Sequence, residues 1–422
     1  MISILHTADW HIGQTFFRSE RYHEHAHFFE WLIDVIKKED IDVLLVAGDV
    51  FDVSNPSAEA QRQFYSFIRQ VKKEVPHLQL VITAGNHDSA SMASAPLIKM
   101  PLEAPLPILE DRRVYVQGVV PRKEGVIDYE QMIIPLYNKQ EEVEAYCLAV
   151  PYLRQGDYPR VDAANPHSAG VRALYSELIE VAQKKRTSQQ ALIAMGHLLA
   201  VKFVDEDNER SERIIVGGLE SVSVDVFKEL NYTALGHIHK AQRIDGCEHI
   251  RYAGSPLSMS FAEKHYKHGV VKVVVDQGET VSIDKIEYEP LVRLMSIPES
   301  GSCLPEQAIK NLVSLPDRSG SEECAMLDPF LEVRVQITEP EPHLAQRLNE
   351  AVEGKAVRLV RIRNDYQLKS EVVGEQRAIK QLDTLNPLDI ANQVFEDKFG
   401  TAMSPELVEI FNEVCQQVHR EE

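Results

Sequence analysis

Short apolar runs alternate with helix-like patterns through the first two thirds of the chain. Each run is rich in Val, Ile, Leu or Ala and ends at polar or turn-forming residues, which predicts a buried strand. The runs are residues 2–8, 42–48, 78–85, 144–152, 191–196 and 232–236. Helices with apolar residues every three or four positions are predicted at residues 21–39, 58–75, 171–186 and 221–230. The alternation predicts an α/β domain with largely buried sheets.

The character of the chain changes after about residue 290. Strand patterns in "HIRYAGSP", "GVVKVVVD" and "TVSIDKIEYEP" continue up to that point. Beyond it, the alternating segments 330–338 and 356–364 flank a predicted helix near 341–353, which suggests a small α+β domain. The end of the chain has no strand pattern, and two apolar-faced helices are predicted there. The expected domains are residues 1–290, 291–375 and 376–422.

Composition narrows the class of protein. The chain has 422 residues, with 45 Lys and Arg against 65 Asp and Glu and a net charge of −20. So acidic a chain is not a general polyanion binder, although the acidity is equally explained by solubility. Its five scattered cysteines include no C-x-x-C pair, which suggests a reducing compartment and argues against a thiolate zinc site. Since we find neither a signal-peptide pattern nor an apolar run of about 20 residues, we expect a cytoplasmic protein without a membrane segment.

Polar side chains gather at the carboxyl ends of the predicted strands. In open α/β sheets these ends form the crevice where ligands bind. One such pair behind a strand is more often structural than functional, but five segments repeat the arrangement in order. The candidate ligands are Asp9, His11, Asp49, Asn86, His197, His237 and His239, with His87 and Asp88 directly after Asn86.

The number and type of these side chains predict a two-metal centre. A single octahedral ion cannot use seven ligands, whereas two ions that share Asp49 can. Two metals about 3.5–4 Å apart clamp a phosphate and position a water for in-line attack. Four imidazoles disfavour Mg²⁺ and Ca²⁺, so two Mn²⁺ ions fit best, with Fe²⁺, Zn²⁺ or Mg²⁺ as substitutes.

The motif order D-x-H, G-D-x-x-D, G-N-H-D, G-H and G-H-x-H resembles the calcineurin-like metallophosphoesterase superfamily. The longer phrases "LHTADWHIGQ", "AGDVFD", "AGNHDS", "AVPYLRQGD", "ERIIVGGLESV" and "YAGSPLSMSF" resemble one branch, the nuclease partners of SbcC-type coiled-coil ATPases. The likeness covers roughly residues 1–290. It implies a four-layer αββα core with a small α+β capping domain and C-terminal helices.

The resemblance also implies roles for single residues. Asp9, His11, Asp49 and His239 would hold one Mn²⁺, and Asp49, Asn86, His197 and His237 the other. His87 would be the catalytic histidine that contacts the scissile phosphate. For Asp88 two roles stay open, a hydrogen bond that orients His87 or a cap on the turn.

Three other polar features are expected to be structural. Asp52 is assigned to the loop after the second strand rather than to a metal. His6 has the opposite parity to Asp9 and is expected to be a satisfied core histidine. The "HEHAH" run at residues 23–27 resembles a metal motif, but the surrounding helical pattern favours a solvated face.

By the same resemblance, the protein would be a Mn²⁺-dependent DNA nuclease subunit. It would act as a 3′–5′ exonuclease on duplex ends and as an endonuclease on single strands and hairpins, in DNA repair, recombination and replication. Residues 376–422 would bind the SbcC-type ATPase, and a homodimer would form within a heterotetramer. The basic cluster at residues 355–380 offers Arg358, Arg361 and Arg363 as DNA contacts, with a solvated strand edge as the alternative.

Two rival functions are weighed against this one. The first is a phosphoesterase of the same superfamily that acts on a small molecule or a phosphoprotein. The small domain and the terminal helices argue against it, because a small substrate needs neither. The second is a non-catalytic scaffold, which the full set of ligands and His87 disfavour.

Overall fold

The computed structural model describes residues 1–88, 112–201, 221–318, 325–337 and 341–366, together with positions 395, 403, 407 and 408. The chain divides into two compact units, Met1–Tyr366 and Gln367–Glu422. The helices predicted in residues 376–422 therefore lie outside the described residues, apart from those four positions. The predicted domain boundaries after residues 290 and 375 stay predictions. Among the helices that the described ranges contain, none is long and apolar enough to cross a membrane.

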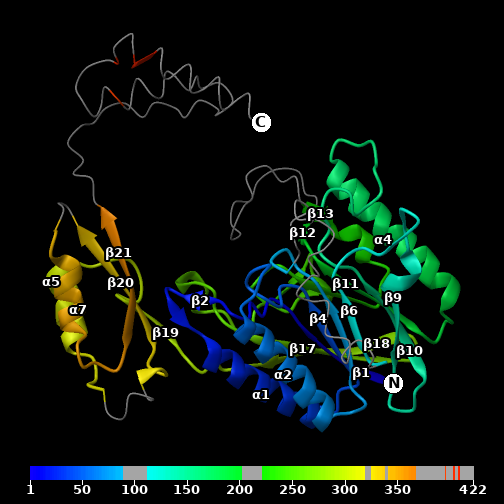
Figure 1. Ribbon diagram of the computed structural model, residues 1–422, viewed down its shortest axis with the longest axis horizontal. Helices are drawn as coiled ribbons and strands as arrows, with labels where there is room; N and C mark the ends of the chain where they lie inside the picture. Colours follow the sequence, from blue (N-terminus) through cyan, green and yellow to red (C-terminus); the bar gives the residue numbers. More distant parts are fainter. Residues whose placement is uncertain are drawn as a thin grey trace. The chain divides into compact units, whose positions relative to one another are not determined.

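The first large sheet has six strands and carries the N-terminus of the chain (Figure 1). Four adjacent strands run parallel; beside them, one strand pairs antiparallel with the first of the four, and the edge strand pairs antiparallel with that one. The order is β18 (Glu279–Glu287), β17 (Gly269–Asp276), β1 (Ile2–Thr7), β4 (Val43–Ala47), β5 (Gln79–Thr83) and β6 (Val114–Gln117). Helices α1 (Tyr22–Lys38) and α2 (Ala58–Glu74) pack on its outer face.

The second large sheet also has six strands, with antiparallel strands at both edges. The order is β15 (Gln242–Ile244), β16 (Cys247–Tyr252), β14 (Tyr232–Gly236), β11 (Ala191–His197), β10 (Val143–Ala149) and β9 (Ile133–Tyr137). Helix α4 (Pro166–Lys185) covers its outer face (Figure 1). Short 3₁₀ turns, η1 (Tyr129–Met132) and η2 (Val224–Phe227), complete this layer.

Three apolar layers hold the two sheets and their helices together. The middle layer lies between the sheets and includes Ile4, Leu45, Ile193 and Ala234, none of which is exposed. Because each sheet buries both faces, its central strands read as continuous apolar runs. This stacking of helices, sheet, sheet and helix confirms the predicted four-layer αββα core.

The six predicted strands and three of the four predicted helices are present. Helix α4 begins five residues before the predicted start, because Asn165 caps it and Pro166 occupies its first turn. The helix predicted at residues 221–230 is wrong. That segment forms strand β13 (Ser221–Ser223), which pairs with β12 (Leu199–Val201), and then the turn η2. In this segment Ser and Val alternate, and Val222 and Val224 are both buried in the core. This spacing of two residues is typical of a strand and not of a helix.

A separate three-stranded sheet follows strand β18. Its strands β19 (Leu294–Ile297), β20 (Phe330–Ile337) and β21 (Arg358–Tyr366) all run parallel. Helices α5 (Pro305–Val313) and α7 (Leu344–Ala351) pack on it around Leu312, Leu331 and Leu348. The prediction of two alternating strands around a helix is confirmed by β20, α7 and β21.

An aromatic cluster joins this small sheet to the large-sheet core. Phe16 comes from the hairpin of β2 (Thr15–Phe16) and β3 (Ser19–Glu20), and Phe261 begins the 3₁₀ turn η3 (Phe261–Glu263). Both pack with Val292 and with Phe330 of β20, and all four side chains are buried. The ring centroids of Phe16 and Phe330 lie 4.9 Å apart.

Candidate metal centre

The predicted ligands lie where five strands end. Strands β1, β4 and β5 of the first sheet lead to Asp9, Asp49 and Asn86. Strands β11 and β14 of the second sheet lead to His197 and His237. The centre is therefore formed jointly by the edges of both sheets, and it exists only when the sheets are packed together.

The backbone at these positions is not extended. Asp9, His11, Asp49 and His237 have φ angles of 54°, 48°, 48° and 98°. Non-glycine residues in this region cost about 1–2 kcal/mol each and persist only where the surrounding structure imposes them. Turns after β1, rather than extended backbone, bring Asp9 and His11 inward. Such strain at four neighbouring positions is typical of a binding site.

Two glycines permit the close approach of these segments. A Cβ on Gly48, which has φ of 83°, would overlap the ring of His197. A Cβ on Gly236 would overlap the carbonyl oxygen of Ala47 on the facing sheet. The pattern "AGD" and "LGH" therefore reflects the packing of the two sheets at the site as well as turn formation.

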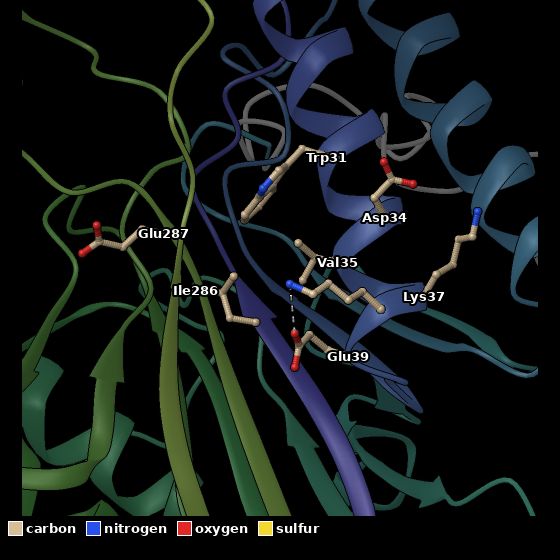
Figure 2. Close-up of a pocket in the computed structure, with 8 residues that line it drawn as sticks. Trp31, Asp34, Val35, Lys37, Glu39, Ile286 and Glu287 are labelled. Carbon is tan, nitrogen blue, oxygen red and sulfur yellow. Dashed lines mark ion pairs between the residues drawn. The ribbon is translucent and has the colours of Figure 1, made fainter.

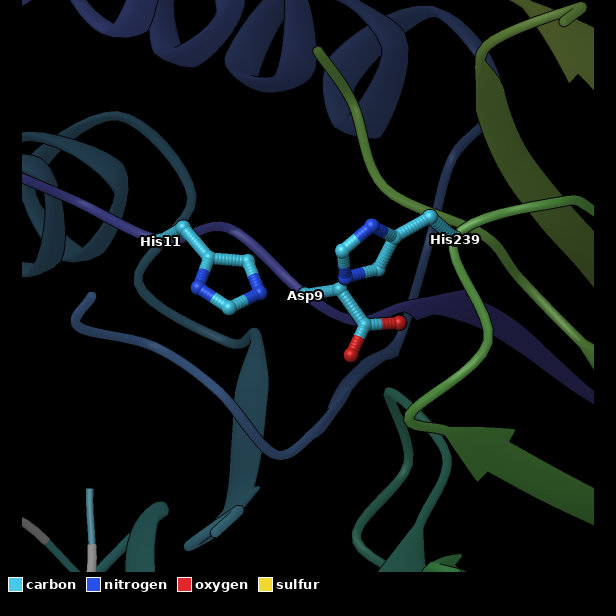
Figure 3. A group of neighbouring side chains, drawn as sticks. All are labelled: Asp9, His11 and His239. Carbon is cyan, nitrogen blue, oxygen red and sulfur yellow. The ribbon is translucent and has the colours of Figure 1, made fainter. Parts of the chain in front are cut away.

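One half of the centre consists of Asp9, His11 and His239 (Figure 3). Their ligand atoms lie within 4.8 Å of one another, and a ring nitrogen of His239 faces Asp9. Asp9 and His11 are buried, and neither Oδ2 of Asp9 nor a ring nitrogen of His11 has a hydrogen-bond partner among the described residues. The nearest carboxylates to His11 are Asp52, 3.2 Å from Nδ1, and Asp49, 3.6 Å from Nε2. Buried polar atoms without partners are rare, so they indicate a ligand.

The other half is formed by Asp49, Asn86, His197 and His237. Nδ1 of His197 donates to the carbonyl of Ala47 at 3.0 Å, which leaves Nε2 facing the centre. Nε2 lies 3.0 Å from Oδ1 of Asn86 and 3.2 Å from Oδ2 of Asp49. Nδ1 of His237 is 3.2 Å from the same Asn86 oxygen. With a neutral imidazole, three acceptor atoms face one another, an arrangement that favours a shared cation.

The pKa shifts of His197 and Asp49 favour positive charge in this half of the centre, whereas that of His237 favours a neutral ring. Burial lowers the pKa of His197, but the carboxylates of Asp49 and Asp9 outweigh it and raise the pKa to about 9. Burial would raise the pKa of Asp49, yet His197 and His11 hold it well below its usual range. Burial, together with His197, lowers the pKa of His237 to about 3. His237 is therefore already in the neutral form that binds metal, whereas His197 would have to release a proton on binding a metal.

The donor set therefore fits a divalent metal. Carboxylate, amide and imidazole atoms converge, and no thiolate is present among them. Buried atoms of Asp9 and His11 have no hydrogen-bond partner among the described residues. Such a set suits Mn²⁺, Fe²⁺ or Zn²⁺ better than Ca²⁺. The number and identity of the ions stay predictions.

His87 lies beside the candidate metal ligands and is held by Asp52. Its backbone N–H donates to Oδ1 of Asp49 at 2.9 Å, and Nδ1 donates to the carbonyl of Asp52 at 2.6 Å. The ring centroids of His87 and His11 are 4.8 Å apart. The loop role expected for Asp52 thus includes the orientation of His87, and its carboxylate also approaches His11.

Asp88 does not orient His87. Its two oxygens accept backbone N–H groups of Val50, Phe51 and Gly85 at 2.8–3.0 Å, and its side chain is fully buried. The hydrogen bond expected between Asp88 and His87 is therefore wrong, and the alternative role of a turn cap agrees with the structure. Burial, with the nearby charge of Asp49, raises the pKa of Asp88 to about 6. Asp88 fastens the loop after β5 to the loop after β4, and so places Asn86 and His87.

Comparisons with known proteins agree with this geometry. The sequence model of the calcineurin-like phosphoesterase family matches residues 2–241, more than half of the chain. The chain belongs to this family. A second model, described as the type 5 capsule protein repressor C-terminal domain, matches residues 290–399.

Three curated relatives are each named as the D subunit of the nuclease SbcCD. The relative from Rhodobacter capsulatus is 37% identical over 84% of this chain and 85% of its own length. The Escherichia coli K12 relative is 27% identical over 94% of this chain and 92% of its own. The Bacillus subtilis relative is 27% identical over 99% of both chains. The phosphoesterase fold and the branch expected from the sequence motifs are confirmed.

The arginines predicted as DNA contacts lie on strand β21 and have partners within the chain. Nε of Arg358 donates to the carbonyl of Asp328, and its guanidinium lies 4.0 Å from the ring centre of Phe330. Arg361 forms an ion pair of 3.1 Å with the buried carboxylate of Glu332. Arg363 pairs with Asp365 at 2.9 Å. A role for these arginines in DNA binding stays a prediction.

The polar residues that were expected to be structural agree with that expectation only in part. His6 is buried and its Nδ1 is hydrogen-bonded to the hydroxyl of Tyr232, as expected for a core histidine, but its Nε2 has no hydrogen-bond partner among the described residues. The solvated face expected for "HEHAH" is wrong for Glu24 and His25, because both side chains are buried. Glu24 forms an ion pair with Arg21, and His25 donates to the backbone carbonyl of Trp10. Sequence reasoning also missed Glu263, whose carboxylate binds His239. No spacing relative to the motifs points to it.

A hollow on the surface lies away from the candidate metal ligands. It has a volume of about 660 Å³ between α1 and β18, with Trp31, Val35 and Ile286 on its walls (Figure 2). Both basic and acidic side chains line it, including Lys37, Glu39 and Glu287. It contains none of the predicted site residues, so the candidate chemistry belongs to the strand-end centre.

Proposed function

We propose that this protein is a Mn²⁺-dependent DNA nuclease subunit. The observation that carries the proposal is the convergence of seven donor side chains at the joint edge of two sheets, where buried atoms of Asp9 and His11 have no hydrogen-bond partner among the described residues. Membership in the phosphoesterase family and the relatives named as nuclease subunits support phosphodiester hydrolysis. The chain is therefore assigned to the metal-dependent nucleases.

The proposed ligand sets follow the two halves of the centre. Asp9, His11, Asp49 and His239 would hold one ion, and Asp49, Asn86, His197 and His237 the other. Bound divalent ions supply Lewis-acid polarisation of a phosphate and a water nucleophile at neutral pH. Asp49 would contribute to both sets, since its Oδ2 lies between Nε2 of His11 and Nε2 of His197.

The chain's own residues would then orient the phosphate and manage the leaving group. His87 is the proposed catalytic residue. Because its Nδ1 is engaged by Asp52, its Nε2 is the ring atom left to contact a phosphate oxygen or carry a proton to the departing 3′-oxygen. Asp88 would act indirectly, because its hydrogen bonds fix the loop that carries His87. A fixed imidazole loses less freedom in the transition state.

The finer activities belong to the same proposal. The protein would act as a 3′–5′ exonuclease on duplex ends and an endonuclease on hairpins and single strands, with roles in repair, recombination and replication. Residues 376–422 would bind an SbcC-type ATPase, and two copies would pair within a heterotetramer in the cytoplasm. The relatives' name, which includes SbcCD, supports the partner. Bound cations would offset the repulsion between DNA and a chain of net charge −20.

A substrate comparison tests the proposal. Purified full chain would be given a blunt DNA duplex, a hairpin and a chromogenic phosphate ester, each with Mn²⁺ and with chelator. We expect Mn²⁺-dependent cleavage of both DNA substrates. Activity on the ester alone would favour the rival phosphoesterase acting on a small molecule or phosphoprotein. The same assay with and without a co-purified coiled-coil ATPase tests the partner.

A further inference from the structure

Glu263 is a buried carboxylate that contacts a proposed metal ligand. Its Oε1 accepts from Nδ1 of His239 at 3.2 Å. The exposed fractions of the two side chains are 9% for Glu263 and 26% for His239. This bond selects the tautomer that leaves Nε2 of His239 for the centre, where Figure 3 shows a ring nitrogen toward Asp9. Metal-binding histidines commonly use a carboxylate in this way.

Backbone hydrogen bonds hold the loop of Glu263 firmly against His239. Oε2 of Glu263 accepts from the N–H of Met259 at 2.7 Å, so each carboxylate oxygen has its own donor. The N–H of Ser255 donates to the carbonyl of His239 at 3.0 Å. At the far side, the buried Arg21 donates to the carbonyl of Ser258 at 2.7 Å. The loop therefore follows any displacement of the turn η3 that carries Glu263.

The same turn is tied to the small sheet. Phe261 lies two positions before Glu263 and is buried in the cluster that contains Phe16, Val292 and Phe330. Its ring centroid is 5.3 Å from that of Phe16, which in turn is 4.9 Å from Phe330 on β20. One three-residue turn thus presents an aromatic side chain to the small sheet and a carboxylate to the centre.

We propose that Glu263 is a positioning residue for His239, and that the Phe16–Phe261–Phe330 cluster braces the turn that carries it. The small sheet then influences metal affinity without supplying a ligand. The inference rests on the proposed function, because it takes His239 as a metal ligand. A purely structural role for Glu263 would require only its bond to Met259, and that bond leaves Oε1 unexplained.

Metal affinity of the full chain tests the first part of the proposal. Chelator-stripped protein would be titrated with Mn²⁺ alone, with free Mn²⁺ followed by electron paramagnetic resonance and folding followed by circular dichroism. The Glu263→Gln variant keeps one acceptor oxygen for two donors, so we expect Mn²⁺ affinity to fall about 10- to 100-fold. Glu263→Asp keeps the charge and should recover part of the loss. Glu289→Gln, an exposed carboxylate paired with Arg293, is the matched control and should bind as wild type.

Two outcomes separate this inference from the metal-site proposal. If His239→Ala binds Mn²⁺ as wild type, the ligand assignment itself is wrong. If His239→Ala loses affinity while Glu263→Gln and Glu263→Asp do not, only the positioning role is overturned. Should Glu263→Gln fail to fold, Glu263→Asp decides, with wild-type affinity as the contradicting result.

A substitution in the small sheet tests the brace. Phe330→Leu should weaken Mn²⁺ binding less than Glu263→Gln does, and the double variant should lose less than the two single effects combined, because both act through one turn. Leu312→Ala is the control, since Leu312 is buried in the small sheet's own core outside the cluster. Equal Mn²⁺ affinity of Phe330→Leu and Leu312→Ala would overturn the brace.

Discussion

The metal centre and strand β21 both concentrate charged side chains, but they satisfy them in opposite ways. In the metal centre, Oδ2 of Asp9 and both ring nitrogens of His11 are buried without a hydrogen-bond partner among the described residues, although the carboxylates of Asp52 and Asp49 approach His11. On β21, Arg361 and Arg363 each form an ion pair with a carboxylate of the chain. Both regions stand out in the sequence, the first by polar residues after five predicted strands and the second by closely spaced arginines. The partners distinguish the two regions, with one exception on β21: Nη2 of Arg358 is buried without a hydrogen-bond partner among the described residues.

This difference shows which kind of cluster predicts function. Burying polar atoms without partners is costly, so the chain keeps such an arrangement only where something else completes it. Exposed or half-buried arginines carry no such cost and pair with nearby acids at little net gain. The following changes test the contrast, from the largest expected effect to the smallest.

Asp49→Asn should have the largest effect, because Asp49 is the carboxylate proposed to serve both ions. Loss of several kcal/mol of charge stabilisation corresponds to a fall in DNA cleavage of at least about 10³-fold. The measurement is the rate of duplex degradation at saturating Mn²⁺. Asp40→Asn, an exposed aspartate paired with Lys139, should cleave normally. Normal cleavage by Asp49→Asn would remove the two-metal proposal.

His87→Ala should separate chemistry from metal binding. Loss of a positioned acid or transition-state contact lowers rates by about 10²- to 10⁴-fold. Because His87 is outside the proposed ligand sets, Mn²⁺ affinity should stay at the wild-type value. Single-turnover cleavage and a Mn²⁺ titration on the same preparation provide both readings. A variant with wild-type cleavage would contradict the catalytic role.

Metal removal should destabilise the centre but leave β21 unaffected. A ligand at about 100 times its dissociation constant adds about 2.7 kcal/mol to the free energy of unfolding. Thermal unfolding should therefore shift upward when Mn²⁺ is added to stripped wild-type protein. The shift should be smaller in Asp49→Asn and intact in Arg363→Gln. An equal shift in Asp49→Asn and wild type would mean that Mn²⁺ binds elsewhere.

His6 tests a buried histidine of strand β1 that already has an internal partner. Burial lowers its pKa to about 3, so the folded protein keeps His6 neutral while the unfolded chain takes up a proton below about pH 6.5. The contribution of His6 to stability is complete above pH 6.5 and falls as the pH decreases toward 3. Between about pH 6.5 and 4.5 the loss should approach roughly 2–3 kcal/mol.

Denaturant unfolding of metal-free protein across this pH range measures the His6 effect. His6→Asn should flatten the acid limb of the stability curve, whereas substitution of the exposed His23 by Asn should leave its slope unchanged. An unchanged slope in His6→Asn would show that His6 is not the titrating group.

Arg361→Gln should cost about 1–3 kcal/mol of stability, because Glu332 is buried and would lose one of its two arginine partners. Arg363→Gln breaks an exposed pair and should cost about 0.5 kcal/mol or less. Chemical unfolding measures both. If Arg361 instead contacts DNA, Arg361→Gln would weaken DNA binding and reduce its salt slope by about one. That result would support the predicted DNA contact.

Much of the core could be predicted because its signals are local. Strand β4 reads as a continuous apolar run, and α2 shows a helical repeat behind a capping Ser57. The wrongly predicted helix at residues 221–230 shows the limit of local signals, because residues 221–223 pair instead with strand β12 at residues 199–201. Position and neighbours decided that segment, not propensity.

The sequence by itself determined the ligand types, their order at five strand ends, and the presence of His87 beside Asn86. These follow from short motifs, whose residues act at fixed offsets from their own strands. Only the tertiary structure decided that Asp52 rather than Asp88 holds His87, that His25 is buried, and that Glu263 binds His239. Each of these facts joins segments far apart along the chain, and the packing of two sheets and a loop sets their distance. No periodicity in a single segment carries that information.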